Sequence, residues 1–255
     1  MSVSLFWAKG QGYCRRKASI LFFKRPFVIR TQRPLISFSF DDFPESALRT
    51  GGAILKHFGL AGTYYASLGL MGKDTATGRI FGPADLGVVC EQGHELGCHT
   101  FSHCHAWDTA TRAFEEAIID NRSALHDLLP GVEFQTFSYP ISGPRPLTKL
   151  RAAEHFLCCR GGGQKFNVGT TDLNNLSAYF LEKTRHRIEL VKDLIDHNRQ
   201  ALGWLIFATH DISDNPTPYG CVPGFFEEVV RYAVASGANI LPVVEALKAL
   251  RSARM

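Results

Sequence analysis

Several features that would place this chain outside the ordinary globular proteins are missing from its sequence. No apolar run approaches the ~18 residues that a membrane-spanning helix needs, so we expect no transmembrane segment. There is no internal repeat and no low-complexity stretch, and 45% of the residues are hydrophobic. This composition excludes a collagen-like or intrinsically disordered chain. The 255 residues suffice for one large domain or two small ones.

Signals for disulfide bonding and secretion are also missing. The seven cysteines are odd in number and include no CxxC pair. Free thiols in a chain of this length argue against a disulfide framework and favour a reducing compartment. The apolar stretches at 3–7 and 20–23 are too short for the core of a signal peptide and are broken by charges. We therefore expect a cytoplasmic protein.

Acidic residues are absent from the first 35 positions, which hold eight basic residues. The other positions hold 20 basic and 24 acidic residues, so a basic segment is joined to a mildly acidic body. We predict a basic N-terminal extension over 1–33 and one main domain over 34–255. Because the positive charge is local, no nucleic-acid partner is expected. An organellar transit peptide and a loosely docked extension are the alternatives for this segment.

From residue 34 onward, apolar runs typical of strands alternate with helical patterns. The predicted strands cover 34–40, 62–67, 95–99, 133–139, 156–160, 203–209 and 239–241. The run at 203–209 (GWLIFAT) is unbroken, which is typical of a fully buried parallel strand. A long helix is expected after Thr184, which could cap it. The alternation predicts a parallel sheet, either closed into a barrel or open, with its active site at the carboxyl ends of the strands.

Residues with useful chemistry do follow the predicted strands. They form four sets. The first two are the pair Asp41 and Asp42 and the pair His99 and His103; the others are the run Tyr139, Pro140 and Ile141 and the pair His210 and Asp211. We therefore expect these sets to meet at one edge of the sheet.

The spacing of His99 and His103 suits metal binding. Two imidazoles four residues apart on a helical turn lie on the same side and can coordinate one ion. A third ligand, Asp42 or Asp41, would leave a position open for water. Alternatively, the pair merely belongs to a histidine-rich region, since His94 lies close by. Asp42 could likewise cap the helix that follows it.

Four stretches together resemble the polysaccharide deacetylases, the NodB-homology family of metal-dependent carbohydrate deacetylases. They are FSFDDFPES (38–46), HELGCHTFSHCHA (94–106), FSYPISG (137–143) and LIFATHD (205–211). The resemblance covers about residues 34–250. It implies a distorted (β/α) barrel with about seven parallel strands, and it makes 34–255 the catalytic domain.

The resemblance also implies roles for individual residues. Asp42, His99 and His103 would bind a divalent metal, usually zinc, with Asp41 as the general base. The backbone N–H of Ile141, after Pro140, would bind the oxyanion, and His210 would protonate the leaving group. The implied substrate is an acetylated sugar.

The sequence departs from the family pattern at several positions. Phe43 stands where the family usually has glycine, and Ser138 and Ile141 stand where it often has Arg and Tyr. Arg160, after the next predicted strand, is our candidate for the missing guanidinium that orients Asp41. Asp172 is the nearest candidate for an acidic partner of His210.

We expect aromatic and polar residues beside the motifs to contact the sugar, namely Tyr139, Pro140, Trp107 and Asp211. Cys98 and Cys104 flank the histidine pair and are interpreted as structural. Three alternatives stay open: a non-catalytic carbohydrate-binding relative, an amidohydrolase acting on a small non-sugar amide, and a non-haem iron oxygenase.

Overall fold

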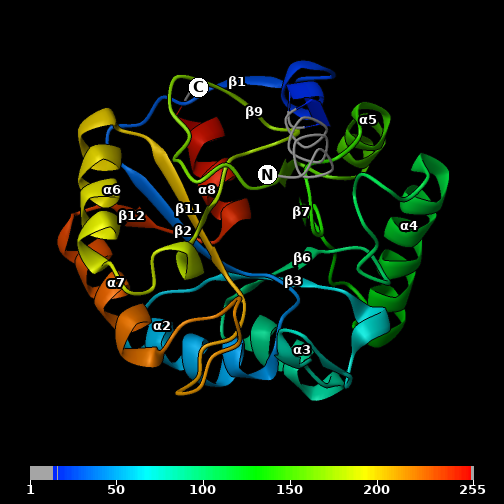
Figure 1. Cartoon of the computed structure of the whole chain (residues 1–255), viewed down its shortest axis with the longest axis horizontal. Coiled ribbons are helices and arrows are strands. Elements are labelled where there is room, and N and C mark those ends of the chain that lie inside the picture. The colour runs from blue at the N-terminus through cyan, green and yellow to red at the C-terminus, as the bar shows by residue number, and fades with distance from the viewer. Residues whose placement is uncertain (1–13, 16, 254–255) are drawn as a thin grey trace, which may run out of the picture.

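The computed structural model describes residues 14–15 and 17–253, and a curled sheet of parallel strands runs through its middle (Figure 1). The strand order is β10-β11-β2-β3-β6-β7-β8. Neighbours along this path are all parallel. The bounds are β2 (Leu35–Phe40), β3 (Thr63–Ala66), β6 (Glu95–Cys98), β7 (Thr136–Ser138), β8 (Cys158–Arg160), β10 (Tyr179–Phe180) and β11 (Trp204–Thr209). The predicted fold, a distorted (β/α) barrel with about seven parallel strands, is confirmed.

Helices surround this sheet, with α3, α4, α6 and α7 along the periphery of Figure 1. A π-helical turn (Ala47–Gly52) leads into α2 (Ala53–His57). The others are α3 (Pro83–Glu91), α4 (Thr111–Leu128), α5 (Pro146–His155), α6 (Ile188–Ala201), α7 (Pro223–Ala235) and α8 (Val243–Ser252). Proline opens α3, α5 and α7, where its missing N–H costs no helical hydrogen bond. Among the described residues, none of the helices combines the length and apolar character needed to cross a bilayer.

The centre of the core lies around β2 and β11, whose residues are all buried. Burial on both faces explains why the two strands are continuous apolar runs instead of alternating patterns. Phe38 of β2 stacks on Phe207 of β11 with 5.5 Å between ring centroids, and Phe226 of α7 meets Phe38 edge-on at 5.6 Å. These contacts fix the strand end that carries Asp41.

The structure adds detail to one predicted strand and corrects one predicted helix cap. The predicted strand at 239–241 forms as β12 (Asn239–Ile240), but it pairs with β2 outside the main path, and the unpredicted β10 takes the edge beside β11. Thr184 does not cap α6, which begins at Ile188. Its hydroxyl instead bonds the carbonyl of Leu181, 3.5 Å away.

The described part of the basic segment packs against the body of the protein. β1 (Pro26–Val28) pairs antiparallel with β9 (Thr170–Asp172). Lys149 of α5 is fully buried, and its Nζ lies 2.5 Å from Asp172 and donates to the carbonyls of Ser19 and Phe22 at 2.9 Å. The first 13 residues of the predicted extension, and residue 16, lie outside the described residues.

His94 makes the stability of the fold sensitive to acid. It is 7% exposed, and its Nδ1 accepts a hydrogen bond from the backbone N–H of Gly62 at 3.0 Å. Burial, helped by the charge of Lys56, lowers the pKa of His94 to about 4. The unfolded chain protonates this group near pH 6.5, so its contribution to stability is complete above pH 6.5 and is lost as the pH falls towards 4.

We expect the free energy of unfolding to fall by up to about 3 kcal/mol over this window because of His94 alone. Urea unfolding between pH 7 and 4 measures the slope, which should be shallower in His94→Gln. His57→Gln, at an exposed position, is the matched control and should keep the wild-type slope. Identical slopes for His94→Gln and the wild type would contradict the assignment.

Candidate active site

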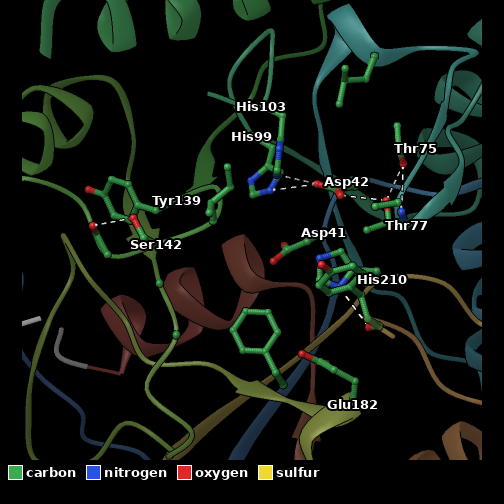
Figure 2. Close-up of a pocket in the computed structure, with 18 of the residues that line it drawn as sticks. Asp41, Asp42, Thr75, Thr77, His99, His103, Tyr139, Ser142, Glu182 and His210 are labelled. Atoms are coloured by element: carbon green, nitrogen blue, oxygen red, sulfur yellow. Dashed lines mark hydrogen bonds and ion pairs between the residues drawn. The ribbon is translucent and has the colours of Figure 1, made fainter. Parts of the chain in front are cut away.

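A cavity of about 670 Å³ opens at the carboxyl ends of the strands (Figure 2). Seven of the predicted site residues line it, namely Asp41, Asp42, His99, His103, Tyr139, Ile141 and His210. A volume of this size is typical of small-molecule sites. The sets predicted to meet at one edge of the sheet therefore do so.

Four of the predicted residues lie outside the lining, and one of them, Arg160, is described below with Asp41. Pro140 is buried behind the turn. The ring of Trp107 is covered by the guanidinium of Arg15, which lies 5.4 Å from its centroid. Asp211 accepts hydrogen bonds from the N–H and hydroxyl of Thr217, at 2.8 and 2.5 Å, so its carboxylate closes the loop that carries Tyr219.

Left-handed backbone turns surround the cavity. Five residues that are not glycine have φ between +52° and +66° there, namely Asp42, Phe43, Thr100, His103 and Ile141. Such angles are costly, most of all for β-branched residues, and concentrate at functional sites. The fully buried ring of Phe43 stacks on Phe81 at 4.5 Å and contacts Tyr64 at 4.8 Å. This packing offsets the strain of a side chain at the position that the family pattern gives to glycine.

Asp42, His99 and His103 point at one another. The Nε2 atoms of His99 and His103 lie 3.4 and 3.1 Å from Oδ1 of Asp42. The three residues each offer one ligand atom, and these three atoms lie within 4.8 Å of one another. Nδ1 of His99 contacts the carbonyl of Ser138 at 2.8 Å. Because a carbonyl only accepts, Nδ1 carries the proton and Nε2 keeps its lone pair for a metal.

The state of Asp42 fits a cation at this position. Its Oδ2 accepts from the hydroxyl of Thr77 at 2.9 Å, which leaves Oδ1 facing the two imidazoles. Burial favours a raised pKa for Asp42, but contacts with His103 and His99 outweigh burial and hold the pKa far below its usual range. The same contacts raise the pKa of His103 against the effect of its burial. One carboxylate and two imidazoles are a ligand set for a divalent metal. Asp42 does not cap the helical turn that follows, because the N-cap of that turn is Ser46 and no side chain caps it.

Asp41 has a different partner. Nη2 of Arg160 donates to Oδ1 of Asp41, and both side chains are buried. The guanidinium lies over the ring of Tyr65, 4.6 Å from its centroid. Arg160 therefore contacts Asp41 as expected, although it lies on β8, four strands away from β2 in the sheet.

His210 follows β11, the strand that pairs with β2, so it lies next to Asp41. Its Nδ1 donates to the carbonyl of Tyr219 at 3.2 Å, and its ring is nearly parallel to that of Phe180, 6.4 Å away. Asp172 is not its acidic partner, because that carboxylate pairs with Lys149. The hypothesis of an Asp172–His210 pair was wrong.

Glu182 is a site residue that the sequence did not reveal. It lines the cavity from the turn Leu181–Lys183 that follows β10, and in Figure 2 it points towards Asp41. Its Oε2 is buried without a hydrogen-bond partner, and burial raises the pKa of Glu182 to about 7. The only signal was an acidic residue after a two-residue strand, which has no visible periodicity.

The fold resembles several solved carbohydrate deacetylases. Peptidoglycan deacetylase PdaC from Bacillus subtilis is 15% identical, with 88% of this chain and 94% of that one covered and a TM-score of 0.56. The chitin deacetylase from the fungal pathogen Colletotrichum lindemuthianum is 12% identical, with 86% and 89% covered and a TM-score of 0.62. A CE4 family pseudoenzyme from Bacillus anthracis is 8% identical, with 85% and 66% covered and a TM-score of 0.58.

The sequence itself gives the family. No curated protein matches the sequence. The sequence profile of the polysaccharide deacetylases matches residues 29–156, a segment that contains Asp41, Asp42, His99, His103 and the turn after β7. This match covers half of the chain. The chain therefore belongs to the polysaccharide deacetylase family.

Proposed function

We propose that this protein is a metal-dependent hydrolase that removes an acetyl group from an N-acetylated or O-acetylated sugar. The observation that carries the proposal is the arrangement of two adjacent carboxylates in one cavity. Asp42 faces two imidazoles, while Asp41 faces a buried guanidinium. Their different neighbours suit Asp42 to bind a metal and Asp41 to accept a proton.

In this proposal, Asp42, His99 and His103 hold the cation, which we expect to be zinc. A divalent cation there supplies a Lewis acid for the acyl oxygen and lowers the pKa of the attacking water. Asp41 accepts the proton of that water as general base. Arg160 orients the carboxylate of Asp41 by donating a hydrogen bond to its Oδ1.

The remaining steps fall to residues that follow two other strands, β7 and β11. Ile141 lies in the left-handed turn after β7, and its backbone N–H is our candidate donor to the oxyanion. His210, oriented by the carbonyl of Tyr219, protonates the leaving amine or alkoxide. Tyr139 lines the same cavity and is proposed to contact the sugar.

The experiment that tests the proposal couples metal content to acetate release. Chelator-stripped protein is compared with protein reloaded with zinc, on chitooligosaccharides, acetylated xylan and a small N-acetyl amide. We expect release from a sugar substrate only with the metal. His103→Gln should bind zinc at least about 100-fold more weakly, because it removes a ligand. His105→Gln, in the same loop but outside the ligand group, should bind zinc normally.

A second candidate is a non-catalytic sugar-binding relative. One solved structure with this fold is described as a pseudoenzyme, and Phe43 and Ile141 depart from the family pattern. Stoichiometric metal with no acetate from any substrate would favour this second candidate. Release from the small amide alone would instead indicate an amidohydrolase with a non-sugar substrate.

A further inference from the structure

Four consecutive apolar side chains near the N-terminus are turned towards solvent. Ile20, Leu21, Phe22 and Phe23 are 52%, 60%, 55% and 41% exposed. We call these four residues the 20–23 patch. Contiguous exposed apolar surface of this kind is unusual on a soluble protein and marks an interaction site.

Hydrogen bonds hold the backbone of this segment against the body of the protein, so the four side chains stay exposed. Lys149 donates to the carbonyls of Ser19 and Phe22, and Asn174 donates to the carbonyl of Phe23, all at 2.9 Å. Phe23 adopts φ of +47°, a strained angle for a phenylalanine. Three inward-facing carbonyls and a left-handed residue therefore direct the apolar side chains outward.

The charged residues of the segment that carries the 20–23 patch are all basic. Lys24 follows it directly and is exposed, and Arg30 and Arg33 are exposed further along the chain. The first 35 residues hold no acid that could oppose these cations. Asp172 lies beside Lys149, and the two side chains form an ion pair. Exposed apolar side chains among cations match the interface of an anionic lipid bilayer.

The patch lies beside the mouth of the cavity. Gly143 lines the cavity, and a Cβ at Gly143 would lie 3.1 Å from the hydroxyl of Ser19. In Figure 1 the dark blue segment sits next to α5 and β9, in agreement with its contacts to Lys149 and Asp172. We propose that the 20–23 patch docks the protein on an anionic phospholipid surface, with the cavity mouth beside the membrane.

Vesicle co-sedimentation of the full chain tests this proposal. Vesicles of phosphatidylcholine with 30% phosphatidylserine are compared with phosphatidylcholine alone, at low salt and at 0.5 M NaCl. We expect apparent affinity on the order of tenfold higher for the anionic vesicles, with most of the difference lost at high salt. Leu21→Ser/Phe22→Ser should lower binding about tenfold.

A matched control separates the patch from general surface stickiness. Ile119→Ser/Leu190→Ser removes two apolar side chains of similar exposure, 47% and 42%, from α4 and α6. This double variant should bind vesicles as the wild type does. Thermal melting checks that both double variants are folded.

Two results would overturn the proposal. One is the absence of sedimentation with anionic vesicles, or equal sedimentation of the wild type and Leu21→Ser/Phe22→Ser. The other is a dimer in light scattering without lipid that the same variant dissociates, because a second copy would then cover the patch. Neither readout involves acetate release, so failure here is distinct from failure of the proposed activity.

Discussion

Asp41→Asn should lower acetate release by about 10²- to 10⁴-fold while the protein still binds one metal ion. The amide cannot accept the proton of the attacking water, but Asp42, His99 and His103 are untouched. Oδ1 of the new amide can still accept the hydrogen bond from Arg160. The loss of activity should therefore not come from loss of the fold or of the metal.

The matched control for Asp41→Asn is Glu95→Gln. Glu95 is also a buried carboxylate, but it lies at the amino end of β6, away from the cavity. It accepts from the hydroxyls of Thr63 and Thr136, at 2.8 and 2.5 Å, and from the N–H of Val244 at 2.9 Å. Glu95→Gln should lower thermal stability and keep kcat. Activity of Asp41→Asn within threefold of the wild type, at equal metal content, would contradict the role of Asp41 as base.

Lys149→Met should be the most destabilising of the substitutions considered, by about 3–5 kcal/mol. The change removes a fully buried ammonium group and leaves Asp172 without its ion pair, together with two carbonyls without their donor. Breaking one side of a buried pair is costly because the remaining charge is no longer compensated. Urea unfolding at pH 7 measures the loss.

Lys248→Met is the control for this loss. Lys248 pairs with Glu245 at 2.9 Å on the exposed face of α8, so its removal should cost about 0.5 kcal/mol or less. Adding Asp172→Asn to Lys149→Met should recover part of the stability, because the double variant leaves no unpaired charge. Equal losses for Lys149→Met and Lys248→Met would show that the buried pair does not anchor the N-terminal segment.

Sequence reasoning succeeded where the pattern was long and continuous. β2 and β11 each have six buried residues, and these runs directly indicate parallel strands. The polar residues after them mark the edge of the sheet. The strand ends also brought Asp41 or Asp42 together with His99 and His103 as a candidate metal site, and the family resemblance selected Asp42 as the third ligand. The contact between Arg160 and Asp41 could only be suggested, because it depends on how tightly the sheet curls between β8 and β2.

The parts that escaped sequence reasoning are short or depend on distant partners. β10 has two residues, too few to show a period, so Glu182 after it was not recognised as a cavity residue. Nothing in the sequence around Asp172 indicates a buried ion pair. Its partner, Lys149 of α5, is revealed only by the structure. The hairpin of β4 (Asp74–Thr75) and β5 (Gly78–Arg79), which brings Thr77 to Asp42, has no apolar pattern at all.

The pairing of β1 with β9 has a consequence for synthesis of the chain. Residues 26–28 leave the ribosome before their partners at 170–172, which are made more than 140 residues later. At about 5–20 residues per second, that delay is on the order of 10 s. Throughout it, the neighbouring Ile20 to Phe23 have no folded surface to anchor them, so the earliest synthesised part of this segment is among the last to reach its native position.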